Sequence, residues 1–187
     1  IEHHMLHFLE NHDEQRIASH QFAGNPLKAV PAMVLAATLN TGPLMLYFGQ
    51  EIGESAADSE GFSGHDGRTT IFDYWCVTEY QKWVNGGEFT TKKLNKNQKE
   101  LRNFYHKLNH LRLNSKAISQ GGFYDLMWVN PHLNQDRVYA YLRHHEDEVL
   151  LVLLNFDLNN GYNFNLKIPP DAMGIAGLPT SKPWQAE

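Results

Sequence analysis

A cluster of polar residues between Glu10 and Arg16 is the part of the sequence best suited to chemistry. Residues 8–16 read FLENHDEQR, which places two amides, an imidazole, three acids and a guanidinium directly after a short apolar run. A carboxylate beside a histidine can bind two adjacent hydroxyl groups, because the carboxylate accepts hydrogen bonds and the imidazole donates them. An ordinary polar turn, with Asp13 and Arg16 as an exposed ion pair of little energetic value, fits the same composition.

The surrounding sequence predicts a βαβ unit that would position this cluster. Residues 5–9 and 44–48 are nearly continuous apolar runs, typical of strands buried on both faces. Between them, Asn25-Pro26 predicts the start of a helix, Pro31 a kink or delay, and Gly42 a left-handed cap after its end. Ligands of α/β folds bind at the carboxyl ends of strands. The polar cluster follows the first run, so we expect a site at that edge.

The second half of the chain has a different pattern. Apolar residues at helical spacing predict an amphipathic helix over residues 98–113. After a boundary near residues 115–122, four strand-like runs follow, separated by Asn, Asp, Gly and Pro: residues 123–129, 138–143, 149–156 and 162–168. Because residues 162–168 alternate between apolar and polar, one face of that strand should be buried. This half is typical of an antiparallel β-sandwich.

Composition excludes several classes of function. The 187 residues carry a formal charge of -5 with no basic face, which argues against a nucleic-acid partner. No apolar stretch approaches the ~20 residues needed to cross a bilayer. The single cysteine, Cys76, excludes an intrachain disulfide and a cysteine-based zinc cluster. His3 and His7 have the spacing of a helical metal pair, but in a strand His7 would be a packed residue, so we assign no metal site.

Two segments of the sequence resemble motifs of the alpha-amylase family of glycoside hydrolases (glycoside hydrolase family 13). Residues 8–13, FLENHD, resemble the F-x-x-N-H-D segment after the seventh barrel strand. Residues 42–51, GPLMLYFGQE, resemble the G-x-P-x-x-Y-x-G-x-E segment at the eighth strand. The resemblance implies an α/β plus β fold, in which residues 1–115 are the C-terminal part of a TIM (β/α)₈ barrel and residues 116–187 are the β-sandwich.

The resemblance also implies roles for individual residues. Asp13 matches the third of the family's three carboxylates, which grips the sugar at the cleaved bond and helps to distort it. The remaining matched positions are contacts to substrate (Asn11, His12, Arg16, Asp66 and Arg68) and supports of the barrel mouth (Tyr47 and Glu51). At residues 66–68 the alignment is loose, and a simple Asp-Gly turn explains the sequence equally well.

The nucleophile and the general acid of this family lie upstream of the segment present here. Retaining hydrolysis needs two carboxyl groups ~5–5.5 Å apart, and Asp13 cannot supply both. The chain starts at Ile1, without a Met or a signal pattern, so we expect a fragment that needs the missing N-terminal part of the barrel as its partner. The substrate implied is an α-glucan or maltooligosaccharide, and localisation cannot be inferred. Calcium is common in the family, with its usual ligands outside this segment.

A non-catalytic carbohydrate-binding module built on the sandwich is the alternative function. It would explain the aromatic residues, although not the Asn11-His12-Asp13 cluster. The candidates for stacking on sugars are Phe62, Phe72, Tyr74 and Trp75, near the loop edge. Three other aromatic residues are expected in the sandwich interior or at its contact with the barrel: Phe123, Tyr124 and Trp128. For Trp83 and Trp184 the sequence is compatible with either a core position or a sugar-stacking position.

Overall fold

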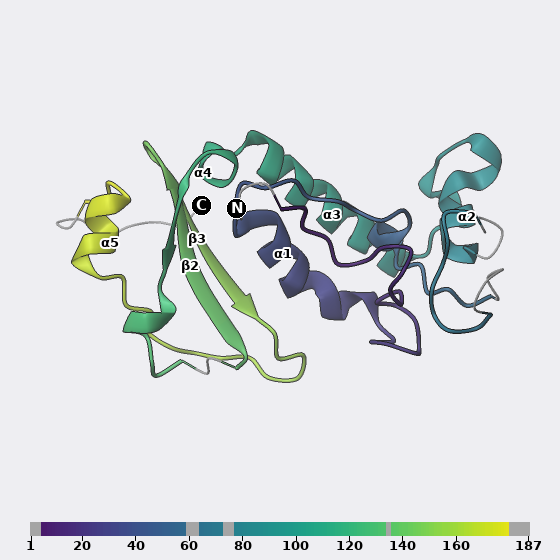
Figure 1. Ribbon diagram of the computed structural model, residues 1–187, viewed down its shortest axis with the longest axis horizontal. Coiled ribbons are helices and arrows are strands. Elements are labelled where there is room, and N and C mark those ends of the chain that lie inside the picture. Colours follow the sequence, from purple (N-terminus) through teal and green to yellow (C-terminus); the bar gives the residue numbers. More distant parts are fainter. Residues whose placement is uncertain (1–4, 59–63, 73–76, 134–135, 180–187) are drawn as a thin grey trace.

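The computed structural model describes residues 5–58, 64–72, 77–133 and 136–179. The first half is built around the helices α1 (Val30–Thr38) and α3 (Lys96–Asn114), and the second half around a three-stranded sheet. Figure 1 shows this sheet between α5 (Pro170–Ile175) and α1. Shorter helices connect these elements: η2 (Pro26–Ala29), η3 (Gln50–Ile52), α2 (Thr78–Val84), η5 (Asn85–Gly87), η6 (Thr91–Lys93), α4 (Lys116–Ser119) and η7 (Met127–Val129).

The two apolar runs of the predicted βαβ unit meet in a single parallel bridge between His7 and Leu44. The His7 N–H donates to the Pro43 carbonyl at 2.9 Å, and the Met45 N–H donates to the His7 carbonyl at 2.8 Å. The helix α1 lies between them in the chain, so the unit has the expected order and strand direction. The prediction of full strands over residues 5–9 and 44–48 is wrong. No third strand pairs with either run among the described residues, and a parallel ladder needs such neighbours.

The start of α1 follows from its sequence, but its end does not. Asn25 accepts a hydrogen bond from the Leu27 N–H, and residues 26–29 form a 3₁₀ turn before α-helix begins at Val30. Pro31 therefore lies in the first turn of α1, where a missing N–H costs nothing, which is the predicted delay. Gly42 does not adopt the predicted left-handed conformation, because side chains from other elements bind the last carbonyls instead.

The predicted amphipathic helix is confirmed as α3. Asn95 and Gln98 form a reciprocal capping box at its start, which satisfies two backbone donors. Its buried face carries Leu101, Tyr105 and Leu108, which pack against α1. This cluster also includes apolar side chains from residues 9, 44 and 46, so α1 and α3 form the support for both extended runs.

The sheet is antiparallel in the order β1 (Gly122–Asp125), β2 (Val138–His145), β3 (Glu148–Asn155). The predicted strands at residues 138–143 and 149–156 are confirmed, and the run at 123–129 divides into β1 and the 3₁₀ turn η7. The described residues form one sheet of three strands, so the second sheet of the expected sandwich is not found among them.

Residues 162–168 show the predicted alternation but no strand. Phe164, Leu166 and Ile168 pack into the apolar cluster on the outer face of the sheet. The backbone of this segment is held by one amide side chain, because Asn130 Nδ2 donates to the Lys167 carbonyl at 2.9 Å and Asn130 Oδ1 accepts from the Lys167 N–H at 2.8 Å. The alternation therefore indicates which side chains are buried, but it does not show that the backbone pairs with a neighbouring strand.

The aromatic residues expected inside the second half are less buried than predicted. Trp128 is 63% exposed, so its interior placement is wrong, and no second sheet among the described residues covers it. Phe123 is 41% exposed and lines a cavity of about 440 Å³ beside Tyr139 and Arg143, at the contact with the first half. Its predicted place at this contact is thus correct. Phe62, Tyr74, Trp75 and Trp184, like His3, His4 and Cys76, lie outside the described residues.

Two arginines bind carbonyls at the end of α1, and one of them, Arg143, connects the second half of the chain to the first. Arg143 of β2 is buried and donates to the carbonyls of Leu39, Ala117, Ile118 and Gly121 at 2.9–3.1 Å. Arg112 of α3 donates to the carbonyl of Ala37, in the last turn of α1, and to the carbonyls of Asn40 and Gly42 just beyond it. Cationic donors are favourable there because the carbonyl end of a helix carries partial negative charge. The predicted boundary near residue 115 falls at the turn between α3 and α4.

Replacing Arg143 should destabilise the whole chain. Arg143→Met keeps much of the side-chain volume but leaves four carbonyls, each buried or partly buried, without this donor, so the free energy of unfolding should fall by roughly 2–4 kcal/mol. Chemical denaturation followed by circular dichroism measures this change. The matched control is Arg137→Met, at the exposed turn residue just before the same strand, with an expected change below about 0.5 kcal/mol. Equal effects of the two substitutions would contradict this role of Arg143.

Candidate active site

The loop after the first extended run is ordered from within by Asn11. Its side-chain Oδ1 accepts the backbone N–H groups of Asp13 at 2.8 Å and Glu14 at 3.0 Å. Such a side-chain-to-backbone turn is typical of Asn and fixes the backbone of the two residues that follow. The Oδ1 atom of Asn11 is therefore engaged in ordering the loop, and a contact of Asn11 with substrate stays a prediction.

His12 and Asp13 project from this loop. Their side chains are 56% and 74% exposed, and His12 Nε2 lies 3.5 Å from Asp13 Oδ2. An imidazole donor and a carboxylate acceptor so close together on an open surface match the arrangement needed for two neighbouring hydroxyl groups. The roles of His12 and Asp13 toward substrate stay predictions, and the structure leaves both side chains accessible to a ligand.

Arg16, predicted to contact substrate, is instead completely buried. Its Nη1 donates to Glu10 Oε2 at 2.8 Å, and its Nε donates to Thr69 Oγ1 at 2.8 Å. The guanidinium carbon lies 4.2 Å from the ring centroid of Tyr47 and 4.9 Å from that of Phe48. The substrate-contact prediction is wrong because Arg16 has no exposed surface to offer a ligand. Its Nη2 has no hydrogen-bond partner among the described residues.

Glu10 holds both ends of the loop with one carboxylate. Besides Arg16, it accepts the Ile17 N–H on Oε1 at 2.8 Å, and it is only 2% exposed. Burial raises the pKa of Glu10 above its ordinary value, while Arg16 and the two hydrogen bonds oppose that rise. No role was predicted for Glu10 from the sequence. The available signal was its position at the end of the apolar run, six residues before the oppositely charged Arg16.

Asp66 and Arg68 form the pair that the sequence suggested, and they form it within a turn. Arg68 Nε donates to Asp66 Oδ2 at 2.5 Å, and the Arg68 N–H donates to Asp66 Oδ1 at 3.0 Å. Gly67 between them has φ +85°, and a Cβ there would lie 2.6 Å from Ser19 Oγ. Both side chains are partly exposed, at 26% for the aspartate and 36% for the arginine. The turn interpretation is therefore confirmed, while contact of this pair with substrate stays a prediction.

Hydrogen bonds join the loop that carries Asp66 and Arg68 (the second loop) to the loop that carries His12 and Asp13 (the first loop). The Arg16 N–H donates to the Gly67 carbonyl at 2.7 Å, and Gln21 Nε2 donates to the His65 carbonyl at 2.7 Å. The Tyr47 hydroxyl donates to the Thr69 carbonyl at 2.8 Å, while its ring supports Arg16. Tyr47 thus has the contacts of a supporting residue, and hydrogen bonds hold the two loops together.

A further buried carboxylate, Glu54, was missed by the sequence analysis. It accepts four backbone N–H groups at 2.9–3.0 Å, from Ser55, Ala56, Glu79 and Tyr80, and so fixes the start of α2 against the turn that follows η3. The sequence contains no spacing that distinguishes Glu54 from an exposed loop acid, because its partners are backbone groups.

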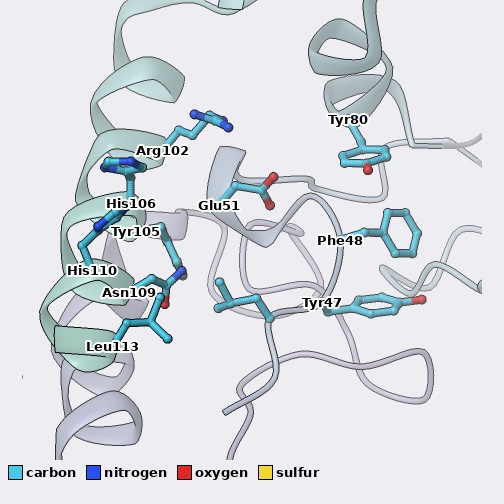
Figure 2. A pocket seen from close by; sticks show the side chains of 11 residues that line it. Tyr47, Phe48, Glu51, Tyr80, Arg102, Tyr105, His106, Asn109, His110 and Leu113 are labelled. Carbon is cyan, nitrogen blue, oxygen red and sulfur yellow. The ribbon is translucent and has the colours of Figure 1, made fainter. Parts of the chain in front are cut away.

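Glu51 lies in the wall of a cavity of about 390 Å³ between α3 and residues 46–51. Figure 2 shows its carboxyl group between α3 and the rings of Phe48 and Tyr80. Burial raises the pKa of Glu51, and Arg102 partly opposes that rise. The remaining lining residues are Leu46, Tyr47, Tyr105, His106, Asn109, His110 and Leu113. Glu51 thus lines this cavity, and its support of the barrel mouth stays a prediction.

The described part of the chain contains no group of three or more His, Cys, Asp or Glu placed to hold a metal ion. No helix within it is long and apolar enough to span a membrane. His7 Nε2 lies 2.6 Å from Asn40 Nδ2, between the two extended runs, which is the packed position expected for this histidine.

Solved structures with similar folds exist, whereas no protein-family model and no curated protein matches the chain. A structure of AmyP in complex with maltose is similar over 81% of this chain and 30% of its own, with 21% identity and a TM-score of 0.52. Trehalose-6-phosphate hydrolase from Bacillus licheniformis (21% identity, 81% and 34% covered) has a TM-score of 0.44. The maltogenic alpha-amylase AmyB from Thermotoga neapolitana (22% identity, 81% and 28% covered) has a TM-score of 0.43.

The chain is therefore similar in fold to part of AmyP and spans less than two thirds of each matched structure. At this level of identity the likeness concerns the backbone arrangement. The barrel closure and the sandwich expected from the sequence are not established by it, because the described residues contain one parallel bridge and one three-stranded sheet.

The raised pKa of Glu51 makes stability depend on pH. The native state binds the Glu51 proton more tightly than the unfolded state does, so its contribution to stability falls as pH rises above the ordinary carboxyl range. Glu51→Gln should therefore increase the free energy of unfolding at pH 7 and have little effect near pH 4. Denaturation midpoints measured across this range test the prediction. The control is Glu100→Gln on the exposed side of α3, and parallel pH curves for wild type and Glu51→Gln would contradict it.

Proposed function

We propose that this chain is part of an alpha-amylase-like retaining glycoside hydrolase that acts on α-glucans. The observation that carries the proposal is the exposed pair His12 and Asp13, 3.5 Å apart, in the loop after the first run of a parallel βαβ unit. The likeness in fold to part of AmyP supports it. The family motifs at residues 8–13 and 42–51 supply the assignment to a chemistry.

In this proposal Asp13 binds the sugar ring at the cleaved bond. Its two carboxylate oxygens accept hydrogen bonds from neighbouring hydroxyl groups of the sugar ring. His12 donates a hydrogen bond to the oxygen of one of these hydroxyl groups. Such contacts accelerate cleavage only if they strengthen as the ring flattens toward an oxocarbenium-like transition state. The Asp66–Arg68 pair, held to the same surface, contacts a sugar farther along the glycan.

The nucleophile and the general acid are proposed to come from the part of the barrel outside this chain. Glu10 is unsuited to either role, because its carboxylate is buried and bound by Arg16 and Ile17. Glu14 is exposed, but the family motif gives its position neither role. The chain alone should therefore bind sugar without cleaving it. Calcium, which is common in the family, would be held by the rest of the protein.

A carbohydrate-binding role for the second half is the second candidate. It is favoured by one observation, the exposed Trp128 with Tyr124 beside it at a ring-centroid distance of 6.4 Å. Aromatic faces of this kind can stack on pyranose rings. This surface lies on η7 and β1, away from the loop of His12 and Asp13 in the chain, so the two candidates predict different responses to substitution.

Isothermal titration with maltotriose tests the proposed function. Asp13→Asn removes the charge and one acceptor, and it should weaken binding by about tenfold, whereas Trp128→Ala should leave the affinity unchanged. Asp147→Asn, at the turn between β2 and β3, is the matched acidic control. Loss of binding in Trp128→Ala alone would support the carbohydrate-binding alternative. Release of sugar from soluble starch by the wild-type chain, abolished in Asp13→Asn, would overturn the assignment of the catalytic pair to the rest of the barrel.

A further inference from the structure

We infer that Glu10 is a positioning residue for the sugar-binding loop, acting on Asp13 by closing the loop behind it. This inference rests on the proposed function of Asp13. It assigns to Glu10 a role distinct from that of the exposed acids, since Glu10 touches no substrate. Its carboxylate is 2% exposed and lies behind the loop.

The geometry of the loop carries the inference. The two oxygens of Glu10 hold Arg16 Nη1 and the Ile17 N–H, both at 2.8 Å, so one carboxylate fastens the far end of the loop to its beginning. Inside this closed segment, Asn11 binds the N–H groups of Asp13 and Glu14. Asp13 therefore sits on a backbone that is fixed at both ends and in the middle, although its own side chain is open to solvent.

Arg16 extends the closure to the second loop. It reaches Thr69 Oγ1 through Nε and the Gly67 carbonyl through its backbone N–H, and it packs on the ring of Tyr47. A buried guanidinium needs a paired anion, because an unpaired charge in the interior is strongly unfavourable. Removing the charge of Glu10 should therefore release Arg16 and loosen the Asp13 loop and the Asp66–Arg68 turn together.

The test compares Glu10→Gln with wild type by amide hydrogen exchange and by maltotriose titration, at a temperature where both are folded. The N–H groups of Asp13 and Glu14 should exchange about tenfold faster in Glu10→Gln, while those of α3 should keep their rates. Affinity for maltotriose should fall about fivefold to tenfold, as expected when a binding group is misplaced. A merely structural role would instead raise exchange by the same factor throughout the chain.

The matched control is Glu79→Gln, which breaks another carboxylate–cation pair, with Lys82 at 2.6 Å, away from the loop. It should change neither the exchange of Asp13 nor the affinity. The same loop response in both variants, or none in Glu10→Gln, would overturn the inference. If Glu10→Gln does not fold, Thr69→Val, which removes one acceptor of Arg16, should give the same local pattern at about twofold to threefold. Wild type that binds no maltotriose would defeat the proposed function, while the exchange rates would still decide the role of Glu10.

Discussion

The burial of one guanidinium, that of Arg16, determines the arrangement of the candidate site. A charged group without solvent must have an anion and further acceptors around it, because the interior cannot replace the hydration that it loses. Glu10 supplies the anion, Thr69 an acceptor, and Tyr47 and Phe48 the flanking rings. These partners come from both loops and from the second extended run. The hydrogen bonds and ring contacts of the Arg16 guanidinium therefore bring together the segments that carry Asp13 and Asp66.

A second constraint joins the site to the rest of the chain. The helix α1 ends without a left-handed glycine, and its last carbonyls are bound by Arg112 from α3 and Arg143 from β2. The hydroxyls of Thr38 and Tyr141 also meet there at 2.6 Å. The end of α1 is thus the point where the sheet contacts the helical half. Because α1 and α3 also support the two extended runs, this junction acts on the site through packed elements.

Local signals in the sequence were sufficient to predict some elements of the structure and not others. The helix at residues 96–114 has both its capping box and its apolar spacing in the sequence, and the exposed pair His12 and Asp13 follows from a short motif. Residues 162–168 alternate correctly yet pair with no strand, because periodicity reports burial and not backbone partners. Arg16 was misassigned for a related reason. Whether an arginine after a strand binds substrate or is buried depends on a carboxylate and a threonine placed by tertiary structure.

The most direct test of the account is the location of bound maltotriose on the isotope-labelled chain, followed through backbone amide shifts in NMR spectra. The account predicts that the largest changes occur at His12, Asp13 and Arg68, which lie on the two loops joined through Arg16. Changes confined to Tyr124 and Trp128 at the sheet, with the residue 11–15 loop unaffected, would contradict it.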